Sequence, residues 1–336
     1  MRAIVQDGYG SIDHLSLGEV PPPVPAEDEV LVRVRAASVH PDVWHVMAGR
    51  PVVLRLMGSG VRGPRERVPG TDVAGVVESV GSAVTRFTPG DEVFGETIRG
   101  IQWSNGGAFA EYATAPEDGL APKPPRVSFE EAAAVPTAGL IALKNLPPHR
   151  VPSGARVLVN GAAGGVGSIA VQLAKAYGAQ VTGVDHASKL ALVQSLGADQ
   201  VIDYTVEDFT RTGEQWDLIF DVPGNHSFGA IRRALRPQGK YVLIGHDAFG
   251  ATGHHWLGSI PRMLGLMARS AVSPQLRGGS FASPEKRQLL AMLAELMESG
   301  QLRTVVDSTY PLEQVREAMR HLMSGQALGR VIVRID

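Results

Sequence analysis

Residues 157–167 read Val-Leu-Val-Asn-Gly-Ala-Ala-Gly-Gly-Val-Gly, and this stretch decides the fold. A short run of β-branched and apolar residues gives way to small residues and glycines, and residues 168–177 then have the composition of a helix. Strand, tight turn and helix in this order are typical of a dinucleotide site, because the glycines let the backbone approach a pyrophosphate at the helix N-terminus. Ala162 stands where the usual G-x-G-x-x-G pattern has its first glycine, so only Gly164 and Gly167 match that pattern.

The residues that follow the turn continue the alternation of strand and helix. Further strands are expected at residues 180–184, 201–204, 216–221 and 240–245, with helices at 188–196 and 227–235. Strands that are apolar on both faces and alternate with helices predict a parallel, doubly wound α/β sheet. A sixth strand is expected at residues 271–276.

The cofactor contacts expected from this pattern lie at the ends of the strands. The turn residues expected to approach the cofactor are Ala163, Gly164, Gly165 and Val166. Asp185 ends the second strand about 20 residues after the turn, where a carboxylate accepts hydrogen bonds from ribose hydroxyls and repels a 2′-phosphate. We expect the Asp185 carboxylate to lie at the surface and to favour NADH slightly over NADPH. Ser188 and Lys189 lie nearby and are suited to a phosphate, so the choice of cofactor stays open.

The two ends of the chain have a different pattern. The first 120 residues contain short alternating runs separated by Gly, Pro and Asp turns, which predicts an antiparallel, barrel-like β domain. A linker at residues 121–125 precedes a helix expected at 128–145, with Ser128 as its N-cap. The last strand, residues 329–334, is expected to pair back with the N-terminal β domain.

The expected domain boundaries follow from these patterns. We assign residues 1–121 and 300–336 to the β domain and residues 122–299 to the dinucleotide-binding domain, since 336 residues are many for one core. After the fifth strand of the dinucleotide-binding domain, helices are expected at residues 263–268 and 284–299. A further helix is expected at residues 312–323, before the last strand.

Composition excludes several classes of function. The net charge is −2 and the basic residues are scattered, so no nucleic-acid or membrane partner is expected. The N-terminal residues have no long apolar run of the kind found in secretory signals, and we expect a cytoplasmic enzyme. The chain contains no cysteine, which excludes disulfides, Fe–S clusters, thiolate nucleophiles and any zinc site that needs Cys ligands.

Five ordered motifs resemble the medium-chain dehydrogenase/reductase superfamily, and within it the zinc-free quinone-oxidoreductase branch. They are Glu-Val-Leu-Val-Arg-Val at 29–34, Gly-Thr-Asp-Val-Ala-Gly-Val-Val-Glu-Ser-Val-Gly at 70–81, Pro-Gly-Asp-Glu-Val-Phe-Gly at 89–95, Gly-Ala-Phe-Ala-Glu-Tyr at 107–112, and the glycine turn. The resemblance implies a GroES-like β-barrel domain made from both chain ends, a Rossmann domain between them, and an active site in the cleft. It also implies an NAD(P)H cofactor and a homodimer, in which the sixth strand would offer a sheet edge.

The resemblance also bears on metal binding and on the reaction. Zinc members of the superfamily carry a Cys in the segment matching residues 38–42, a His at the place of Thr71 and a third ligand near Thr137. Here the first position is His40 and the second is Thr71, whereas a catalytic zinc needs three protein ligands. Without that Lewis acid we expect no metal, and reduction of a quinone or an α,β-unsaturated carbonyl rather than alcohol oxidation. The alternatives are an enoyl-thioester reductase and a non-catalytic, nucleotide-binding regulatory protein.

Several single residues are candidates by the same resemblance. Thr137 matches a residue that contacts the cofactor near the nicotinamide, and the alternative is a helix-interior hydroxyl bonded back to a carbonyl. Tyr204 matches a position that flanks the adenosine phosphate. Arg330 matches a basic residue that contacts a phosphate, and the alternative is a surface charge. Ile244 and Gly245 end the fifth strand, at the sheet edge where ligands bind. For catalysis His40, with Asp42 and Trp44 nearby, is the first candidate and His246 the second. The cluster of His254, His255 and Trp256 would form a lid or a solvated loop.

Overall fold

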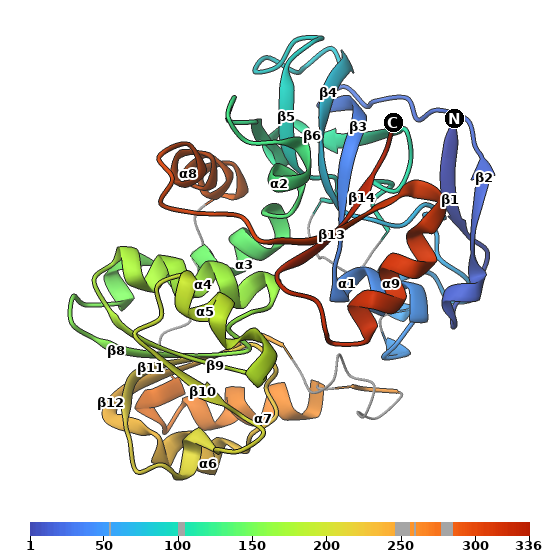
Figure 1. Cartoon of the computed structure of the whole chain (residues 1–336). Helices are drawn as coiled ribbons and strands as arrows, with labels where there is room; N and C mark the ends of the chain where they lie inside the picture. Colours follow the sequence, from blue (N-terminus) through green and yellow to red (C-terminus); the bar gives the residue numbers. More distant parts are fainter. Residues whose placement is uncertain (54, 100–104, 246–255, 259, 277–284) are drawn as a thin grey trace. The chain divides into compact units, whose positions relative to one another are not determined.

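The computed structural model forms two compact units (Figure 1). It describes residues 1–53, 55–99, 105–245, 256–258, 260–276 and 285–336. The first unit comprises Met1–Leu140, Glu285–Gly300 and Thr304–Asp336, and the second comprises Ile141–Pro284 and Gln301–Arg303. Residues 122–140 and 285–299 therefore lie in the first unit, not in the dinucleotide-binding unit as expected from the sequence. They stay there because helix packing joins them: a Cβ atom at Gly139 would lie 2.6 Å from the Leu293 side chain.

The second unit is built on a five-stranded parallel sheet. Its strands are β8 (Arg156–Asn160), β9 (Gln180–Asp185), β10 (Gln200–Asp203), β11 (Trp216–Asp221) and β12 (Leu235–Leu243), in the order β10-β9-β8-β11-β12. The connecting helices are α4 (Gly165–Ala176), α5 (Leu190–Ser195) and α6 (Phe228–Arg233). The chain starts in the middle and winds outward in both directions, so the doubly wound α/β prediction is confirmed. Large apolar side chains fill the core between sheet and helices, among them Leu158, Trp216 and Ile219.

The prediction of a sixth strand at residues 271–276 is wrong. Helix α7 (Ile260–Ser270) is followed by a turn and by the 3₁₀ helix η8 (Pro274–Leu276). Pro274 has no N–H for a strand ladder, which favours the turn. Lys240 Nζ donates a hydrogen bond of 2.9 Å to the Pro274 carbonyl and holds this turn against β12.

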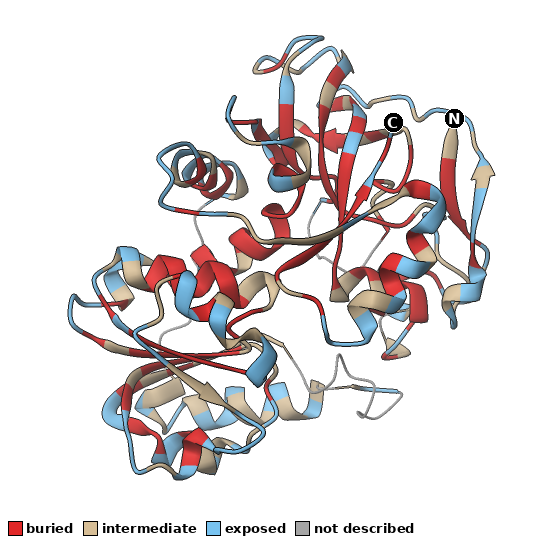
Figure 2. Ribbon diagram, in the orientation of Figure 1, coloured by how far each residue is buried: buried red, intermediate tan, exposed pale blue. Residues whose placement is uncertain are grey.

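The first unit is mainly β-structure. Its strands are β1 (Arg2–Gln6), β2 (Leu15–Glu19), β3 (Glu29–Val39), β4 (Asp72–Val80), β5 (Glu92–Glu96), β6 (Tyr112–Pro116), β7 (Leu120–Pro122), β13 (Val306–Pro311) and β14 (Arg330–Arg334). Seven of them form one sheet in the order β13-β14-β3-β4-β5-β7, with β6 paired to β3. The C-terminal strand β14 pairs antiparallel with β3, for example Val333 with Ala37, so its expected return to the N-terminal β domain is confirmed. Buried residues follow these strands (Figure 2).

Among the described residues, five α-helices lie wholly or partly in the first unit. They are α1 (Pro41–Ala48), α2 (Phe129–Ala133), α3 (Pro136–Asn145), α8 (Lys286–Glu298) and α9 (Val315–Met323). The single helix expected at 128–145 is two helices, because Pro136 cannot donate a helical hydrogen bond and α3 starts anew there. Ser128 is the N-cap of α2 as expected, and Glu131 completes a reciprocal capping box.

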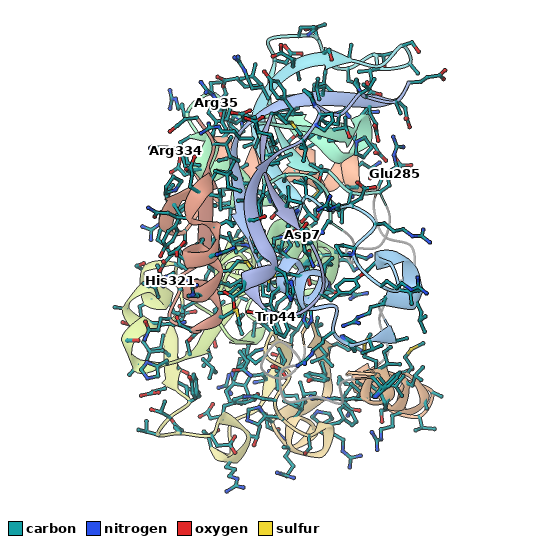
Figure 3. The ribbon with its side chains drawn as sticks, turned by 90° about the vertical axis from the view of Figure 1, so that its right-hand side faces the viewer. Asp7, Arg35, Trp44, Glu285, His321 and Arg334 are labelled. Carbon is teal, nitrogen blue, oxygen red and sulfur yellow. The ribbon has the colours of Figure 1, made fainter. Side chains whose placement is uncertain are left out.

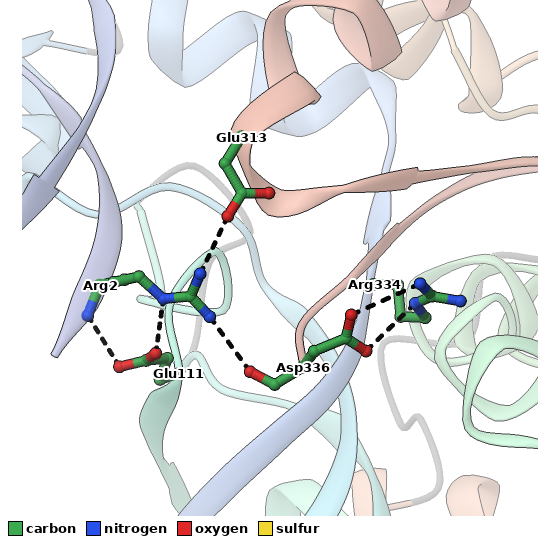
Figure 4. Close-up of polar contacts among 5 residues, drawn as sticks. All are labelled: Arg2, Glu111, Glu313, Arg334 and Asp336. Carbon is green, nitrogen blue, oxygen red and sulfur yellow. Dashed lines mark hydrogen bonds and ion pairs between the residues drawn. The ribbon is translucent and has the colours of Figure 1, made fainter.

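The two chain ends are tied together by charged side chains (Figure 4). Arg2 contacts Glu111 at 2.7 Å and Glu313 at 3.0 Å, and it donates to the Asp336 carbonyl at 3.2 Å. This network fastens β1 to the segment before β6 and to the C-terminus. In the described part of the chain, no helix combines the length and the apolar composition needed to cross a bilayer.

Candidate active site

In the second unit, strand register brings the predicted cofactor residues to one sheet edge. Asp203 pairs with Asp185, Val184 with Asn160, and Asn160 with Asp221, so β8 to β11 end side by side. Because the strands are parallel, their carboxyl ends share this edge. The predicted residues found at this edge are Ala163, Gly164, Gly165, Val166, Asp185, Ser188, Lys189, Tyr204, Ile244 and Gly245.

The glycine turn is shaped for an anion at the start of α4. Gly161 has a φ of +79°, and a Cβ atom at Gly167 would collide with the Gly161 carbonyl oxygen. These two glycines let the turn fold tightly over the first turn of α4. At Gly164, the N-cap, an added Cβ would meet only the Gly161 oxygen at 3.6 Å, and no side chain caps the helix. Open amides and a positive helix end fit the pyrophosphate of a dinucleotide.

Asp185 is bonded to the protein itself rather than exposed at the surface. Only 8% of the residue is exposed. Its Oδ2 accepts a hydrogen bond of 2.8 Å from the Ala163 amide, and its Oδ1 accepts one of 2.9 Å from the His186 amide. The carboxylate thus fastens the glycine turn to the end of β9, which corrects the expectation of a surface carboxylate.

The alternative phosphate contacts gather beside Asp185. His186 caps the 3₁₀ helix η5 (Ala187–Lys189) by accepting a hydrogen bond from the Ser188 amide, and its Nδ1 lies 2.9 Å from Ser188 Oγ. Tyr204 is 57% exposed, and its ring centre lies 6.1 Å from that of His186. Ser188, Lys189 and Tyr204 therefore lie near one another, just after the carboxyl ends of β9 and β10.

A buried polar network that sequence reasoning missed supports the other side of this edge. The Asp221 carboxylate accepts hydrogen bonds from Asn160 Nδ2 at 2.9 Å and from the Tyr241 hydroxyl at 2.8 Å. Burial raises the pKa of the Tyr241 phenol, and the Asp221 charge raises it further. The network joins β8, β11 and β12 just before Ile244, whose amide donates to the Asp221 carbonyl at 2.9 Å.

In the first unit, His40 is buried with one free ring nitrogen. The residue is 1% exposed and precedes α1 as its N-cap residue. Its Nε2 lies 2.8 Å from Thr71 Oγ1, and its Nδ1 lies 3.6 Å from Asp42 Oδ2, too far for a hydrogen bond. Among the described residues, Nδ1 has no hydrogen-bond partner. Trp44 follows on the same helix (Figure 3), with its ring centre 5.1 Å from that of His45.

The charge of Asp42 is stabilised by its surroundings. Burial alone would raise the pKa of the Asp42 carboxyl, but neighbouring basic side chains outweigh burial and lower that pKa. These side chains are His40, His45 and Arg330. The carboxylate next to His40 is therefore ionised over the neutral pH range.

Thr137 and Arg330 also lie in the first unit. The Thr137 hydroxyl is buried between two carboxylates, 2.5 Å from Asp72 Oδ1 and 2.9 Å from Glu96 Oε1. Arg330 is 5% exposed, and its Nε has no hydrogen-bond partner in the part of the chain that the structure describes. Burial lowers the pKa of its guanidinium, whereas the charges of Asp72, Asp42 and Glu96 oppose that shift. The alternative interpretation of Arg330, a surface charge, is therefore wrong, and a contact with a cofactor phosphate stays a prediction.

The remaining candidates are three histidines and Trp256. His246, His254 and His255 lie outside the described residues. Trp256 is described and is 74% exposed.

The superfamily's zinc does not fit the residues present. The ligand positions hold His40 and Thr71, and these two side chains are hydrogen-bonded to each other. Within the described ranges, no group of three or more His, Asp or Glu side chains is arranged to hold a metal ion. A catalytic zinc needs three such ligands.

Sequence reasoning missed Asp72 and Glu96, which contact Thr137. It also missed Ser38, which donates to Asp72, and Lys286, which pairs with Glu96. The one available signal was a polar residue at the end of an apolar strand, as at Glu96 after Val93 and Phe94. Lys286 gave no signal, since it lies 190 positions further along the chain.

Comparisons with known proteins agree with this architecture. Residues 26–125 match the family model of the alcohol dehydrogenase GroES-like domain, and residues 196–333 match that of a zinc-binding dehydrogenase. A 2-methylene-furan-3-one reductase from Solanum lycopersicum is 35% identical over 99% of this chain and 79% of its own length. An NADPH-dependent alkenal/one oxidoreductase from Arabidopsis thaliana is 34% identical with the same coverage. The quinone oxidoreductase structure from Coxiella burnetii superposes with a TM-score of 0.83, at 27% identity, over 100% of this chain and 99% of that one.

The order of elements, the glycine turn at the carboxyl edge of the parallel sheet and the full-length matches lead to one assignment. The chain belongs to the medium-chain dehydrogenase/reductase superfamily, in its quinone oxidoreductase-like branch.

Proposed function

We propose that the protein reduces a quinone or an α,β-unsaturated carbonyl with NAD(P)H, by direct hydride transfer and without zinc. The observation that carries the proposal is full-length similarity to alkenal/one and furanone reductases in a chain whose zinc-ligand positions are His40 and Thr71. NAD(P)H, when bound, supplies the hydride. The acceptor gains that hydride and one proton, so the protein has to orient the acceptor and provide the proton.

The second unit provides the cofactor site in this proposal. The amides of Gly165 and Val166, in the first turn of α4, bind the pyrophosphate, and the tight turn at Gly161 brings the backbone close to it. Ile244 and Gly245 offer backbone groups at the end of β12. Arg330, in the first unit, is a separate candidate for binding an anionic group, with a buried guanidinium whose Nε has no hydrogen-bond partner among the described residues.

NADH is proposed as the slightly preferred cofactor. The support is the negative charge of Asp185 at the end of β9, where a 2′-phosphate would meet it. Ser188, Lys189 and Tyr204 are the residues that would reverse this preference. Equilibrium titration of the protein with NADH and NADPH tests it, and tenfold tighter binding of NADPH would contradict it.

His40 is proposed as the group nearest to the reacting atoms, with His246 as the second candidate. The support for His40 is its unpartnered Nδ1 beside an ionised Asp42. A His40→Gln variant should bind the cofactor as before but turn over on the order of a hundredfold more slowly, the lower end for a lost general acid. Unchanged turnover would exclude His40.

The activity is tested by following cofactor oxidation with 1,4-benzoquinone, with a simple enone and with an acyl thioester. Turnover with the first two supports the proposal, and turnover with the thioester alone supports an enoyl-thioester reductase. Cofactor binding without turnover on any of them would indicate a nucleotide-binding regulatory protein. Activity should survive EDTA, and metal analysis that finds about one zinc per chain would contradict zinc independence.

A homodimer and a cytoplasmic location complete the proposal. Helix α7 presents apolar side chains to solvent, with Met263, Leu264 and Met267 all at least half exposed, and such a stripe is typical of a contact surface. Light scattering at micromolar concentration tests the dimer, and a monomeric mass would refute it. Cell fractionation tests the location.

A further inference from the structure

An arginine-rich segment follows helix α1 in the first unit. Residues 49–67 contain five arginines and one carboxylate, Glu66, in a chain whose net charge is −2. The local excess of positive charge is therefore a feature of this segment and not of the chain as a whole. Like charges so close in sequence repel one another, and a bound anion relieves that repulsion. The five are Arg50, Arg55, Arg62, Arg65 and Arg67.

Tyr9 holds the backbone of this segment in place. Its hydroxyl donates a hydrogen bond of 2.7 Å to the Gly60 carbonyl, and the Arg55 guanidinium lies over its ring, 4.5 Å from the ring centre. A Cβ atom at Gly49 would lie 2.6 Å from the same ring, so the start of the segment packs there as well. Arg55 Nε also donates to the Gly49 carbonyl at 2.9 Å. Three separate parts of the segment therefore meet at one side chain.

Arg67 is fixed in the fold, whereas three other arginines of the segment are exposed. The Arg67 guanidinium pairs with the Asp7 carboxylate. Arg50, Arg62 and Arg65 are exposed, and no ion pair within the described ranges involves them. Their positive charge is therefore available to a ligand that carries a negative charge.

The backbone keeps Arg62 and Arg65 close together. The Arg65 amide donates to the Ser59 carbonyl at 2.9 Å, which closes a turn around Arg62. A Cβ atom at Gly60 would lie 2.1 Å from the Gly63 carbonyl oxygen, so this turn is tight. Three residues of chain span at most about 11 Å between Cα atoms, and two arginine side chains reach across that distance. The two guanidinium groups can therefore contact one carboxylate or phosphate together.

The segment is joined directly to the helix that follows His40. Helix α1 is about 12 Å long, and its C-cap residue Gly49 opens the segment. An anion held by the segment therefore lies beyond the far end of α1 from His40, the group proposed to be nearest to the reacting atoms. Leu56 and Val61 belong to the same segment and are 72% and 65% exposed, so apolar surface lies among these arginines. A ligand with a reactive carbonyl at one end, an apolar chain and an anion at the other end matches this order.

We propose that Arg62 and Arg65, together with Arg50, bind an anionic group of the acceptor. The preferred substrate is then a quinone or enone that carries a carboxylate or a phosphate at the end of an apolar chain. This inference rests on the proposed function, because it names the substrate class of that reaction. The three arginines determine specificity, since they contact the end of the acceptor that does not react.

Quinones that differ only in charge test the proposal. One is a 1,4-benzoquinone with a long alkyl chain that ends in a carboxylate, and another is its methyl ester. The chain separates the charge from the ring, so the two rings are reduced equally readily. Wild-type kcat/KM should be at least about tenfold higher for the carboxylate, and most of this difference should disappear between about 0.01 M and about 1 M salt. A third quinone ends in a phosphate, and preference for either anion over the ester supports the proposal. Equal kcat/KM for all three at low salt overturns it.

Charge reversal tests the residues. Arg62→Glu with Arg65→Glu should make the carboxylate a poorer substrate than the ester, because the carboxylate then meets two negative charges. Both side chains are exposed, so the variant should melt like the wild type. Arg35→Glu with Arg334→Glu is the matched control, since these arginines are also exposed and Figure 3 shows them well away from Trp44 of α1. A preference that survives in the first variant, or that is lost in the control, overturns the proposal.

Calorimetric binding of the carboxylate and ester quinones separates this proposal from the proposed function. Binding needs no turnover, so tighter binding of the carboxylate supports the anion site even if the protein reduces neither quinone and the proposed function fails. If both quinones are reduced but bind equally tightly, the anion site is wrong and the proposed function stands.

Discussion

At the scale of single residues, Asp185 combines a cofactor role with a structural one. Its two oxygens accept from the amides of Ala163 and His186, so Asp185→Ser leaves buried donors without partners. We expect a loss of about 1–3 kcal/mol in the free energy of unfolding, together with weaker discrimination against NADPH. Denaturant unfolding and NADPH titration measure the two effects. Asp203→Ser is the matched control, since Asp203 lies at the next strand end and accepts from the amide and hydroxyl of nearby Thr205. Equal stability of the two variants would contradict the structural role.

Tyr177 is one of two tyrosines, with Tyr241, whose raised pKa should lower stability at alkaline pH. Burial raises the pKa of Tyr177 to about 12, above the value of about 10 for an unfolded chain. The folded state therefore holds its proton where the unfolded state loses it, so stability is complete below about pH 10 and falls as the pH rises towards 12. Tyr177→Phe should flatten this fall, as measured by urea unfolding at about pH 9 and about pH 11. The same slope in both proteins would exclude Tyr177.

At the scale of elements, α2 depends on its capping box. Ser128 Oγ accepts from the Glu131 amide at 3.1 Å, and the Glu131 carboxylate accepts from the Ser128 amide at 2.8 Å. Ser128→Ala should lower the free energy of unfolding by about 1 kcal/mol, because an orphan amide loses its acceptor. Glu131→Gln keeps the reciprocal bond and should cost much less. Chemical denaturation compares them, and a larger loss in Glu131→Gln would contradict this account.

The contact between α9 and β13 should weaken in acid. His321 Nε2 lies 2.6 Å from Asp307 Oδ2, and the Leu328 amide donates to Asp307 Oδ1 at 2.7 Å (Figure 3 labels His321). Burial would raise the pKa of Asp307, but these hydrogen bonds outweigh it and lower that pKa. Stability is therefore present above about pH 4, the value for an unfolded aspartate, and is lost as the pH falls through the lower folded value. Asp307→Asn should show a shallower acid transition by circular dichroism, and an unchanged one would argue against this contact.

At the scale of the whole molecule, the first unit needs both ends of the chain. Strand β14 lies between β13 and β3, so its removal separates β13 from the sheet and leaves residues 36–39 of β3 without a partner on that side. Deletion of residues 329–336 should prevent folding of the first unit, with loss of soluble expression or of cooperative melting. Deletion of Asp336 alone removes its exposed contacts with Arg334 and Arg2 but keeps β14, and it serves as control. A truncated protein that melts like the wild type would contradict this requirement.

Local pattern determined much of this protein. The strand, glycine turn and helix at 157–177 and the five parallel strands follow from periodicity and turn residues. Parallel strands end at one edge, so the prediction that Asp185, Tyr204 and Gly245 gather there needed no knowledge of side-chain contacts. The N-cap at Ser128 was equally local.

Only the tertiary structure decided which polar side chains meet. Thr137 finds Asp72 and Glu96 at separations of 65 and 41 residues, and Lys286 reaches Glu96 from a helix near the other end of the chain. Periodicity indicates which face of an element is buried, but the partner across that face depends on strand register and on where distant segments return. For the same reason a carboxylate at a strand end could be placed from the sequence, whereas its burial against the Ala163 amide could not.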